Sequence, residues 1–430
     1  MATVNGIARR LCTGMIGATM TQALADFCPG ILHAVPAKDG LLMRVRLPGG
    51  QLPAATLAAI AGLAARHADG GLDLTARANI QLRGIRPAAL APLVEGLCAA
   101  GLLPSAAHDR IRNILVSPFA GVDPTELIDL TPLAATLDRA LIADAALARL
   151  PAKFAFTLDG GGRGFDPGGG DLTLTAVATG AGPRLHLSLA GRPTGLGVTA
   201  DAATTLLVRA CHALLAIAAD RDLPARGRVI VRDPAAYEDF LRRVAAGACP
   251  APPRRKPSAA FGILAEATGH ATLLPTIAFG RLTATEATRL SEQANRFDFD
   301  IRLTPWRNLA LRHVDRSDIP TLGVPLDGST GFAGLAACAG SEGCAQSLAD
   351  VRGDARMFAN AIAGTAPPDD WAIHFAGCAK RCALRGRARV DLIATQNGYD
   401  VLFDGTLAHA GLPPEQALAA ARTAYPTKAP

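Results

Sequence analysis

Aromatic side chains and long apolar runs are both scarce in this sequence. Its 430 residues include 14 phenylalanines, 3 tyrosines and 2 tryptophans, and these do not alternate with basic residues. That scarcity argues against nucleic-acid binding, which relies on basic patches interleaved with aromatic stacking platforms. No apolar run reaches the roughly 20 residues that a membrane-spanning helix requires. We therefore expect a protein that binds neither nucleic acid nor a membrane.

A disulfide framework is not indicated either. The nine cysteines are an odd number, and five of them stand alone: Cys12, Cys28, Cys98, Cys211 and Cys249. Isolated thiols are typical of a reducing compartment, so we expect a cytoplasmic protein. Half of the residues are hydrophobic and the formal net charge is only +6, which indicates globular structure. A chain of this length is expected to form two or three units.

A strand–helix–strand pattern occurs twice. Residues 40–50 and 71–85 alternate with the period of two typical of strands, and the segment between them has apolar residues at helical spacing. The same order returns over residues 270–314. Five identities align the copies at a constant offset of 229: Leu74, Thr75, Asn79, Leu82 and Arg83 match Leu303, Thr304, Asn308, Leu311 and Arg312. Unless two amphipathic strands match by chance, this indicates an internal duplication within an α+β protein.

The last four cysteines form two close pairs. They read C-x5-C (Cys338 and Cys344) and C-x3-C (Cys378 and Cys382), with 33 residues between the pairs. Two such loops can present four thiolates to one centre, as a zinc ion or an iron–sulfur cluster requires. The C-x5-C spacing is wide for a zinc knuckle, and flanking glycines allow backbone N–H groups to approach inorganic sulfide. We expect all four thiolates to hold a [4Fe-4S] cluster; zinc and purely structural thiols are the alternatives.

Basic and amide side chains alternate in the stretch TARANIQLR. A single strand there would place Thr75, Arg77, Asn79, Gln81 and Arg83 on one face. Such a face is either a solvated surface, which the periodicity alone favours, or the wall of a polar site. Arginine is suited to bidentate binding of carboxylates, so the second interpretation predicts a small polyanionic ligand.

Four motifs occur in the order found in the nitrite and sulfite reductase superfamily. They are T-x-R-x-N-I-Q (75–81), RNILVSPFAG (112–121), LPAKF (150–154) and the paired cysteines, and the match covers nearly the whole chain after residue 27. The chain resembles that superfamily. The resemblance implies a duplicated α+β fold of ferredoxin-like half-domains and two α/β domains that bind cluster and substrate.

On this interpretation the chain has six segments. A stretch rich in proline and basic residues separates the two copies and serves as the linker between them. They are an N-terminal extension without stable structure (1–26), a first ferredoxin-like half-domain (27–93), a first α/β domain (94–245), a linker (246–260), a second ferredoxin-like half-domain (261–328) and a cluster-binding domain (329–430).

Two departures from the reductases favour one branch of the superfamily. Reductases typically carry a Lys-x-Lys pair where this chain has K-F-A (153–155), and G-C-P-N-x-C where it has G-C-A-K-R-C (377–382). The segments that begin at Cys28 and Leu150 resemble the precorrin-3B synthase branch instead. That resemblance implies a monooxygenase of aerobic cobalamin biosynthesis, which uses O2 to hydroxylate precorrin-3A at C20 and forms a γ-lactone, giving precorrin-3B.

The resemblance also implies cofactors and a partner. Electrons would come ultimately from NADH through the [4Fe-4S] cluster. A separate reductase would deliver them, because no G-x-G-x-x-G fingerprint follows a strand. A mononuclear non-haem iron is a further cofactor that the branch implies, with His33, His313 and His374 as candidate ligands. Siroheme is not expected.

The predicted substrate-binding residues would pair with the acetate and propionate groups of the tetrapyrrole. They are Arg77, Asn79, Gln81, Arg83, Arg112, Lys153, Arg307 and Arg312. No catalytic residue is predicted. Two alternatives remain open at this point: a siroheme-dependent nitrite or sulfite reductase, and a tetrapyrrole-binding metalloprotein without enzymatic activity.

Overall fold

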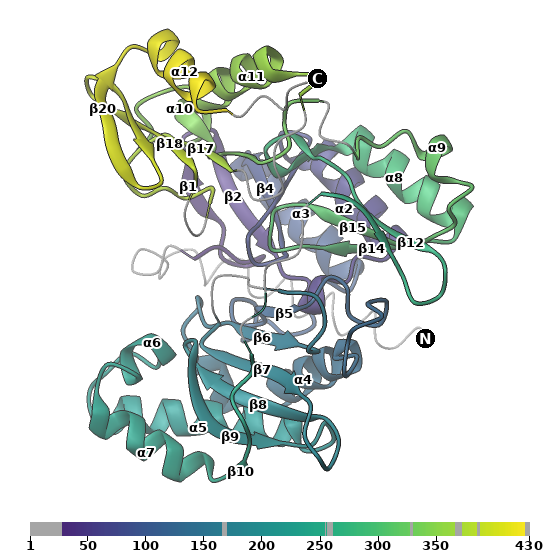
Figure 1. The fold of residues 1–430 in the computed structure, drawn as a ribbon, viewed down its shortest axis with the longest axis vertical. Helices are drawn as coiled ribbons and strands as arrows, with labels where there is room; N and C mark the ends of the chain where they lie inside the picture. Colours follow the sequence, from purple (N-terminus) through teal and green to yellow (C-terminus); the bar gives the residue numbers. More distant parts are fainter. Residues whose placement is uncertain are drawn as a thin grey trace.

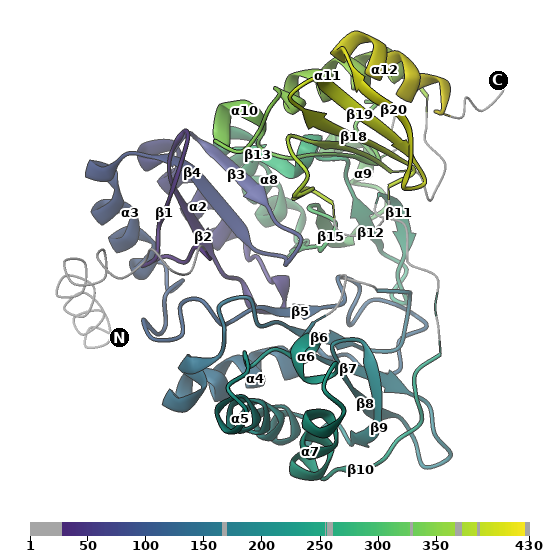
Figure 2. The ribbon, with the colours of Figure 1, turned by 90° about the vertical axis from the view of Figure 1, so that its left-hand side faces the viewer.

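The computed structural model describes residues 28–165, 170–253, 255, 261–326, 330–365, 372–384 and 388–425. The predicted N-terminal extension (1–26) lies outside these residues. The unit from β5 to β10 forms one lobe, at the bottom of Figure 1, and the other elements form a second lobe above it. The view in Figure 2 separates the same two lobes.

Two half-domains of one architecture lie in the upper lobe, each with an antiparallel sheet and a long helix. The first contains β1 (Val35–Ala37), β2 (Gly40–Val45), η1 (Pro48–Gly50), α2 (Ala54–His67), β3 (Gly71–Leu74), β4 (Ile80–Ile85) and α3 (Pro87–Ala99). The second contains β11 (Gly262–Ala265), β12 (Ala271–Leu274), η3 (Ala278–Gly280), β13 (Arg281–Thr283), α8 (Ala284–Phe297), β14 (Asp300–Leu303), β15 (Leu309–Val314) and α9 (Ile319–Leu322).

The half-domains exchange backbone pairing. Strand β13 of the second joins β3 of the first, with Arg281 opposite Asp73, so the first sheet has the order β1-β2-β4-β3-β13. The reciprocal bridge joins Gln51 to Arg302. Asp73 and Arg302 are equivalent at the offset of 229 residues, and Gln51 and Arg281 are equivalent at an offset of 230. The two pairs are therefore the same contact made once by each copy. The predicted fold class, a duplicated α+β protein, is confirmed.

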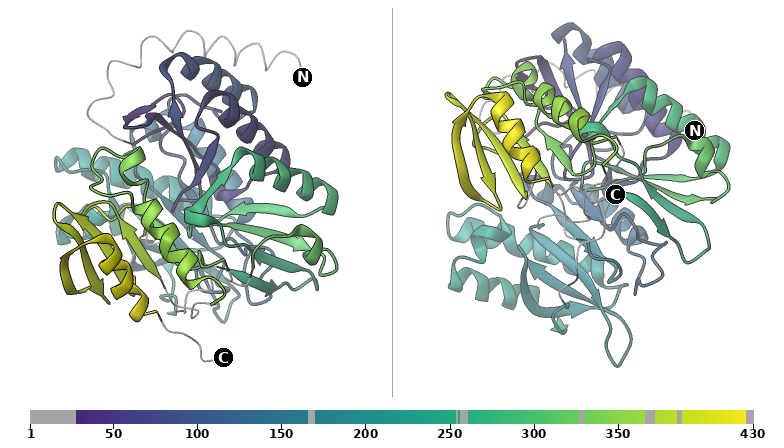
Figure 3. Two further views of the ribbon diagram at one scale, coloured as in Figure 1. Left: turned by 90° about the horizontal axis from the view of Figure 1, so that it is seen from above. Right: turned by 45° about the horizontal axis from the view of Figure 1, so that its top comes forward.

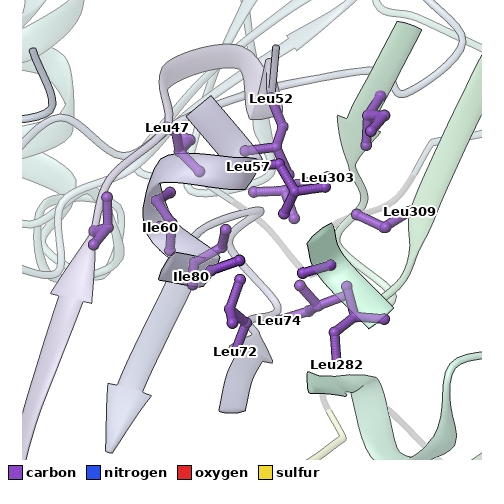
Figure 4. Close-up of a cluster of buried hydrophobic side chains, with 14 of the residues drawn as sticks. Leu47, Leu52, Leu57, Ile60, Leu72, Leu74, Ile80, Leu282, Leu303 and Leu309 are labelled. Atoms are coloured by element: carbon purple, nitrogen blue, oxygen red, sulfur yellow. The ribbon is translucent and has the colours of Figure 1, made fainter. Parts of the chain in front are cut away.

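One hydrophobic core serves both half-domains. Leu52 and Leu57 of the first half-domain belong to the same buried cluster as Leu303 and Leu309 of the second, and Figure 4 shows these side chains facing one another. Helices α2 and α8 pack side by side (Figure 3). Burial of each such side chain contributes roughly 1.5–3 kcal/mol, so each half-domain stabilises the other.

Two α/β units share one sheet topology. The first contains β5 (Ile114–Val116), α4 (Thr131–Ala143), η2 (Ala145–Arg149), β6 (Phe156–Asp159), β7 (Leu172–Val177), β8 (Arg184–Leu189), β9 (Arg192–Val198), α5 (Ala203–Asp220), α6 (Gly227–Ile230), α7 (Pro234–Val244) and β10 (Gly247–Ala248). The second contains β16 (Leu335–Ala337), α10 (Gly340–Gly343), α11 (Val351–Ile362), β17 (Ile373–Ala376), β18 (Val390–Thr395), β19 (Gly398–Phe403), β20 (Thr406–Leu412) and α12 (Pro414–Thr423). In each, three parallel strands are followed by antiparallel ones.

The predicted arginine-bearing strand is wrong in one respect. Strand β3 ends at Leu74 and β4 begins at Ile80, so residues 75–79 form a hairpin loop rather than the middle of one strand. Ala78 turns the chain with a positive φ of 51°. The loop contains no glycine or proline, and its alternating polar residues imitate a strand. Only Gln81 and Arg83 of the predicted set therefore lie on a strand face.

Two further segments bear on the predictions. The linker begins as regular structure, because β10 pairs with β9 and Cys249 beyond it is buried. Helix α5 is long and apolar enough to cross a membrane by length and composition alone. It packs against α4 and α7, and nine of its residues are buried, as in the core helix of a globular unit.

Candidate functional site

The two cysteine pairs lie at one edge of the C-terminal sheet. Cys338 directly follows β16, and Cys378 lies two residues beyond the end of β17. Because these strands are parallel neighbours, their carboxyl ends meet at the same edge. Cys344 follows α10, Cys382 lies in the loop after β17, and all four thiols are free. The topology thus brings together the four cysteines that the spacing singled out.

Backbone and glycine geometry favour a cluster at these thiols. The N–H of Gly377 donates to Sγ of Cys338 at 3.3 Å. A Cβ at Gly377 would lie 1.9 Å from Oγ of Ser347, so only glycine fits there. Partial burial raises the pKa of the Cys382 thiol, and the negative charges of the other three cysteine thiolates raise it further. Because charges shift a pKa in this way only at short range, the four thiols lie close together. Four neighbouring thiols with an N–H donor fit a [4Fe-4S] cluster.

The four thiols are not drawn together as closely as a bound zinc ion would hold them. Zinc holds thiolates at about 2.3 Å, which brings their sulfurs within roughly 4 Å of one another. Among the described residues, no group of three or more His, Cys, Asp or Glu side chains is arranged to hold one metal ion. A cubane cluster does not require such close approach, because each thiolate binds a different iron atom.

The three candidate histidine ligands of a mononuclear iron do not converge. Each pairs with a different carboxylate at 3.1 Å: His33 with Asp109, His313 with Glu266 and His374 with Asp391. They also lie on different elements of the fold. Within the part of the chain that the structure describes, these histidines do not form a common site.

The first α/β unit lacks thiols at the equivalent positions. Matching hydrogen bonds align the two units: Ser117 to Leu158 and Leu127 to Gly160 in the first, Cys338 to Phe375 and Leu348 to Gly377 in the second. In this alignment Asp123 stands where the second unit has Cys344, and Gly161 where it has Cys378. Asp123 forms an ion pair with Arg163 instead. Only the second copy therefore has the thiol set.

The first half-domain meets the cysteine-bearing unit through Arg83 of β4. Its guanidinium binds the carboxylate of Asp39 at two points, 2.8 Å from Nε and 3.1 Å from Nη2. Nη2 also donates to the carbonyl of Gly343, inside the C-x5-C loop. A predicted substrate-binding residue thus lies directly beside this loop.

Two arginines of the same sheet face were not predicted. Nη2 of Arg44 donates to Oε1 of Gln81, its partner across β2 and β4, at 3.2 Å. Arg46 lies two residues further along, and both guanidinium groups approach Sγ of Cys28, at 4.0 and 3.9 Å. Burial lowers the pKa of Arg46 to about 10. The signal was the alternation in MRVR, which places both arginines on one face of a strand.

Two other predicted residues are engaged within the protein. Nε and Nη2 of Arg112 each donate to the carboxylate of Asp138 at 2.7 Å. The guanidinium of the half-buried Arg307 donates to three backbone carbonyls, those of Leu74, Phe279 and Ala337. Arg307 therefore joins the two half-domains to the cysteine-bearing unit.

The remaining predicted residues are dispersed. Asn79 is buried and Arg77 is half-buried, both in the β3–β4 loop, whereas Lys153 is exposed on the turn before β6. Arg312 is buried on β15, and burial lowers its pKa. Of the eight predicted residues, the two on the sheet face next to the C-x5-C loop are Gln81 and Arg83.

Known protein families match three segments of the chain. The nitrite/sulfite reductase ferredoxin-like half domain matches residues 33–100 and 265–322, which are the two half-domains described above. The nitrite and sulphite reductase 4Fe-4S domain matches residues 107–178, in the first α/β unit. The cysteines themselves lie in the second α/β unit, which repeats the topology of the matched one.

Individual relatives match over most of the chain. A precorrin-3B synthase of Sinorhizobium sp is 30% identical over 93% of this chain and 87% of its own length. A ferredoxin–nitrite reductase of Synechococcus elongatus is 26% identical over 87% of this chain and 82% of its own. The solved structure of the NirA protein of Mycobacterium tuberculosis superposes with a TM-score of 0.71 at 22% identity, over 85% of this chain and 75% of that one.

The fold is that of the nitrite and sulfite reductases, duplicated half-domains included. Within this class, the chain belongs to the precorrin-3B synthase family.

Proposed function

We propose that this chain hydroxylates precorrin-3A at C20 in aerobic cobalamin biosynthesis and forms a γ-lactone, giving precorrin-3B. One oxygen atom of O2 enters the substrate and the other leaves as water. Two electrons balance this step, supplied ultimately by NADH through a separate reductase. The similarity to a precorrin-3B synthase over 93% of the chain supports this proposal.

Four thiolates would hold the [4Fe-4S] cluster, those of Cys338, Cys344, Cys378 and Cys382. Bound there, the cluster supplies electrons one at a time. The protein's own contribution is to orient the thiolates on two loops of one sheet edge and to direct the N–H of Gly377 at Cys338.

The single observation that carries the substrate assignment is the arginine-bearing sheet face beside the C-x5-C loop. Arg44 of β2, Arg46 just beyond its end and Arg83 of β4 bring three guanidinium groups to this face, where Arg44 also bonds Gln81 of β4. The guanidinium groups of Arg46 and Arg83 bond within the protein as well, to Pro29 and Asp39. Such groups pair with the acetate and propionate side chains of a tetrapyrrole through charge-assisted hydrogen bonds. We assign them to orienting the substrate beside the cluster.

A siroheme-dependent reductase is the second candidate, because nitrite reductases are also among the relatives. One position argues against it. The reductases' second lysine would fall at Ala155, which is buried against Leu115 and Phe165. A lysine there would lack the water or anion that its charge requires, so the chain retains only the exposed Lys153.

The test is an anaerobic preparation analysed for iron and sulfide and then supplied with precorrin-3A, O2 and a reductant. The proposal predicts four iron and four sulfide per chain, no siroheme absorption bands, and a product one oxygen atom heavier than the substrate. Siroheme bands together with nitrite reduction would favour the second candidate. A colourless protein with one zinc would contradict both.

A further inference from the structure

A buried histidine lies on the strand that leads into the C-x3-C loop. His374 is the second residue of β17 and is fully buried. Its Nδ1 lies 3.1 Å from Oδ1 of Asp391, its register partner on β18. The same carboxylate oxygen accepts a hydrogen bond from Nη2 of Arg381 at 2.5 Å. Because Arg381 lies between Cys378 and Cys382, one carboxylate links the histidine to the cysteine loop.

The hydrogen bonding determines where His374 can accept a proton. Its Nδ1 faces a carboxylate oxygen, so the hydrogen of the neutral ring resides on Nδ1. Its Nε2 is buried with no hydrogen-bond partner among the described residues. Burial lowers the pKa of His374, against the opposing effect of Asp391, so the ring is neutral at neutral pH. The Nε2 lone pair is therefore an unused proton acceptor inside the protein.

The first α/β unit indicates that the sheet does not need this ionisable pair. There the equivalent ladder positions of β6 and β7 hold Thr157 opposite Thr173, just as β17 and β18 hold His374 opposite Asp391. The unit without the thiol set thus has two small neutral residues at these positions. The same sheet topology therefore forms without an ionisable pair at these positions, and the pair occurs in the unit that carries the thiol set.

We propose that His374 takes up a proton at Nε2 when the cluster gains an electron, with Asp391 and Arg381 as its link to the C-x3-C loop. This inference rests on the cluster proposed above but not on the reaction with precorrin-3A. One electron comes from a low-potential reductant and one proton from water, and no covalent bond to a heavy atom breaks. With a neutral ring the three side chains carry no net charge, so the added proton offsets the charge of the added electron.

The charges that face the ring determine the sign of the effect. Asp391 on the neighbouring strand favours the protonated ring, whereas Arg381 of the loop and Arg307 of the second half-domain oppose it. An extra electron on the cluster adds negative charge and therefore favours the protonated ring. Because the reduced state then binds the proton more tightly than the oxidised state, the midpoint potential must fall as pH rises.

The test is a reductive titration of the anaerobic full-length protein with dithionite at several pH values, followed by EPR. For the wild type we expect the potential to fall by about 59 mV per pH unit, the value for one proton per electron. His374→Thr, which introduces the residue of the first unit, should make the potential independent of pH. Asp391→Asn keeps an oxygen for the Nδ1 hydrogen but removes the charge, so it should shift the pH-dependent range to lower pH.

A matched control is available in the first unit. His186 is also fully buried with an unpartnered Nε2, but its Nδ1 faces the carbonyl of Cys249 rather than a carboxylate. His186→Thr should leave the pH dependence of the potential unchanged.

Three outcomes would overturn the inference. They are a wild-type potential independent of pH, a His374→Thr variant that keeps its iron and the wild-type slope, and a His186→Thr variant that abolishes the slope. If His374→Thr loses its iron, His374→Gln is measured against the same criterion. A protein without iron and sulfide would refute the cluster and the proposed function together. The expected slope in a protein that fails to convert precorrin-3A would refute only the reaction.

Discussion

The guanidinium of Arg352 lies 3.2 Å from the carboxylate of Asp73 and thereby ties the cysteine-bearing unit to the first half-domain. Nε of Arg352 also donates to the carbonyl of Cys338 at 3.2 Å. In the other copy, Arg302 occupies the position equivalent to Asp73 and donates to the carbonyl of Ser117, the counterpart of Cys338. Both copies thus have an arginine that joins a half-domain to an α/β unit at equivalent positions. In one copy the α/β unit supplies the arginine, and in the other the half-domain does.

Replacing Asp73 should destabilise the fold. Although burial opposes its ionisation, Arg281 and Arg352 hold the pKa of Asp73 below its usual value. Asp73→Asn leaves two arginines without their buried partner, and we expect a loss of about 3 kcal/mol in chemical denaturation. Because the folded pKa is depressed, this contribution is present at neutral pH and is lost as pH falls below about 4. Asp404→Asn, at an exposed pair with Arg389, should change stability little, and an equal loss would contradict the prediction.

Removing one cysteine should release the cluster. In Cys378→Ser the hydroxyl is a poor iron ligand, so we expect most of the iron and sulfide to be lost, together with the broad absorption near 400 nm. Cys98→Ser on α3 is the matched control, because that thiol lies outside the paired loops. Full iron content in Cys378→Ser, or equal loss in Cys98→Ser, would count against the assigned ligands.

Replacing an arginine of the sheet face should weaken substrate binding. Arg44→Gln removes a charged donor from the face next to the C-x5-C loop. We expect KM for precorrin-3A to rise about tenfold, which corresponds to about 1.4 kcal/mol, while the iron content stays unchanged. Arg139→Gln on the exposed side of α4 is the control. An unchanged KM in Arg44→Gln would remove this face from the site.

The stability of the lower lobe should depend on pH through Glu126. Burial raises the pKa of Glu126 from 4.5 to about 7, although the N–H of Gly121 donates to its carboxylate. Between these values the folded state binds more protons than the unfolded state, so stability falls as pH rises from about 4.5 to about 7.

Glu126→Gln should abolish this decline and melt at a higher temperature than the wild type at pH 8. Glu238→Gln, at an exposed position of α7, should leave the decline intact. Identical melting profiles of wild type and Glu126→Gln between pH 5 and 8 would show that this carboxyl is not the cause.

The duplication and the cysteine pairs could be predicted from the sequence because each leaves a regular residue spacing. For the duplication this is a constant offset between matching residues, and for the cysteines it is the short gaps C-x5-C and C-x3-C. The offset between the copies predicted the duplication but not the exchange of strands between the half-domains, and two parallel strands bring the thiols to one edge. The hairpin at residues 75–79 could not be predicted, since its polar alternation imitates a strand. Arg307 could not be recognised as structural, because its three carbonyl partners come from distant segments.

The sequence singled out His374 as a candidate ligand but did not predict that it pairs with Asp391. Their contact depends on the register between β17 and β18, which the sequence does not specify. The equivalence of Thr157 and Thr173 to this pair likewise follows from the strand register of the two sheets, which the sequence does not show.

The measurement that tests the central claim most directly is mass spectrometry of the product formed from precorrin-3A under oxygen-18 gas. The anaerobically prepared protein is supplied with a reductant and its iron and sulfide are determined in the same sample. The proposed function predicts a product that carries one atom of oxygen-18, formed only when the cluster is present. A cluster-bearing protein that leaves precorrin-3A unchanged, or a product whose added oxygen comes from water, would contradict it.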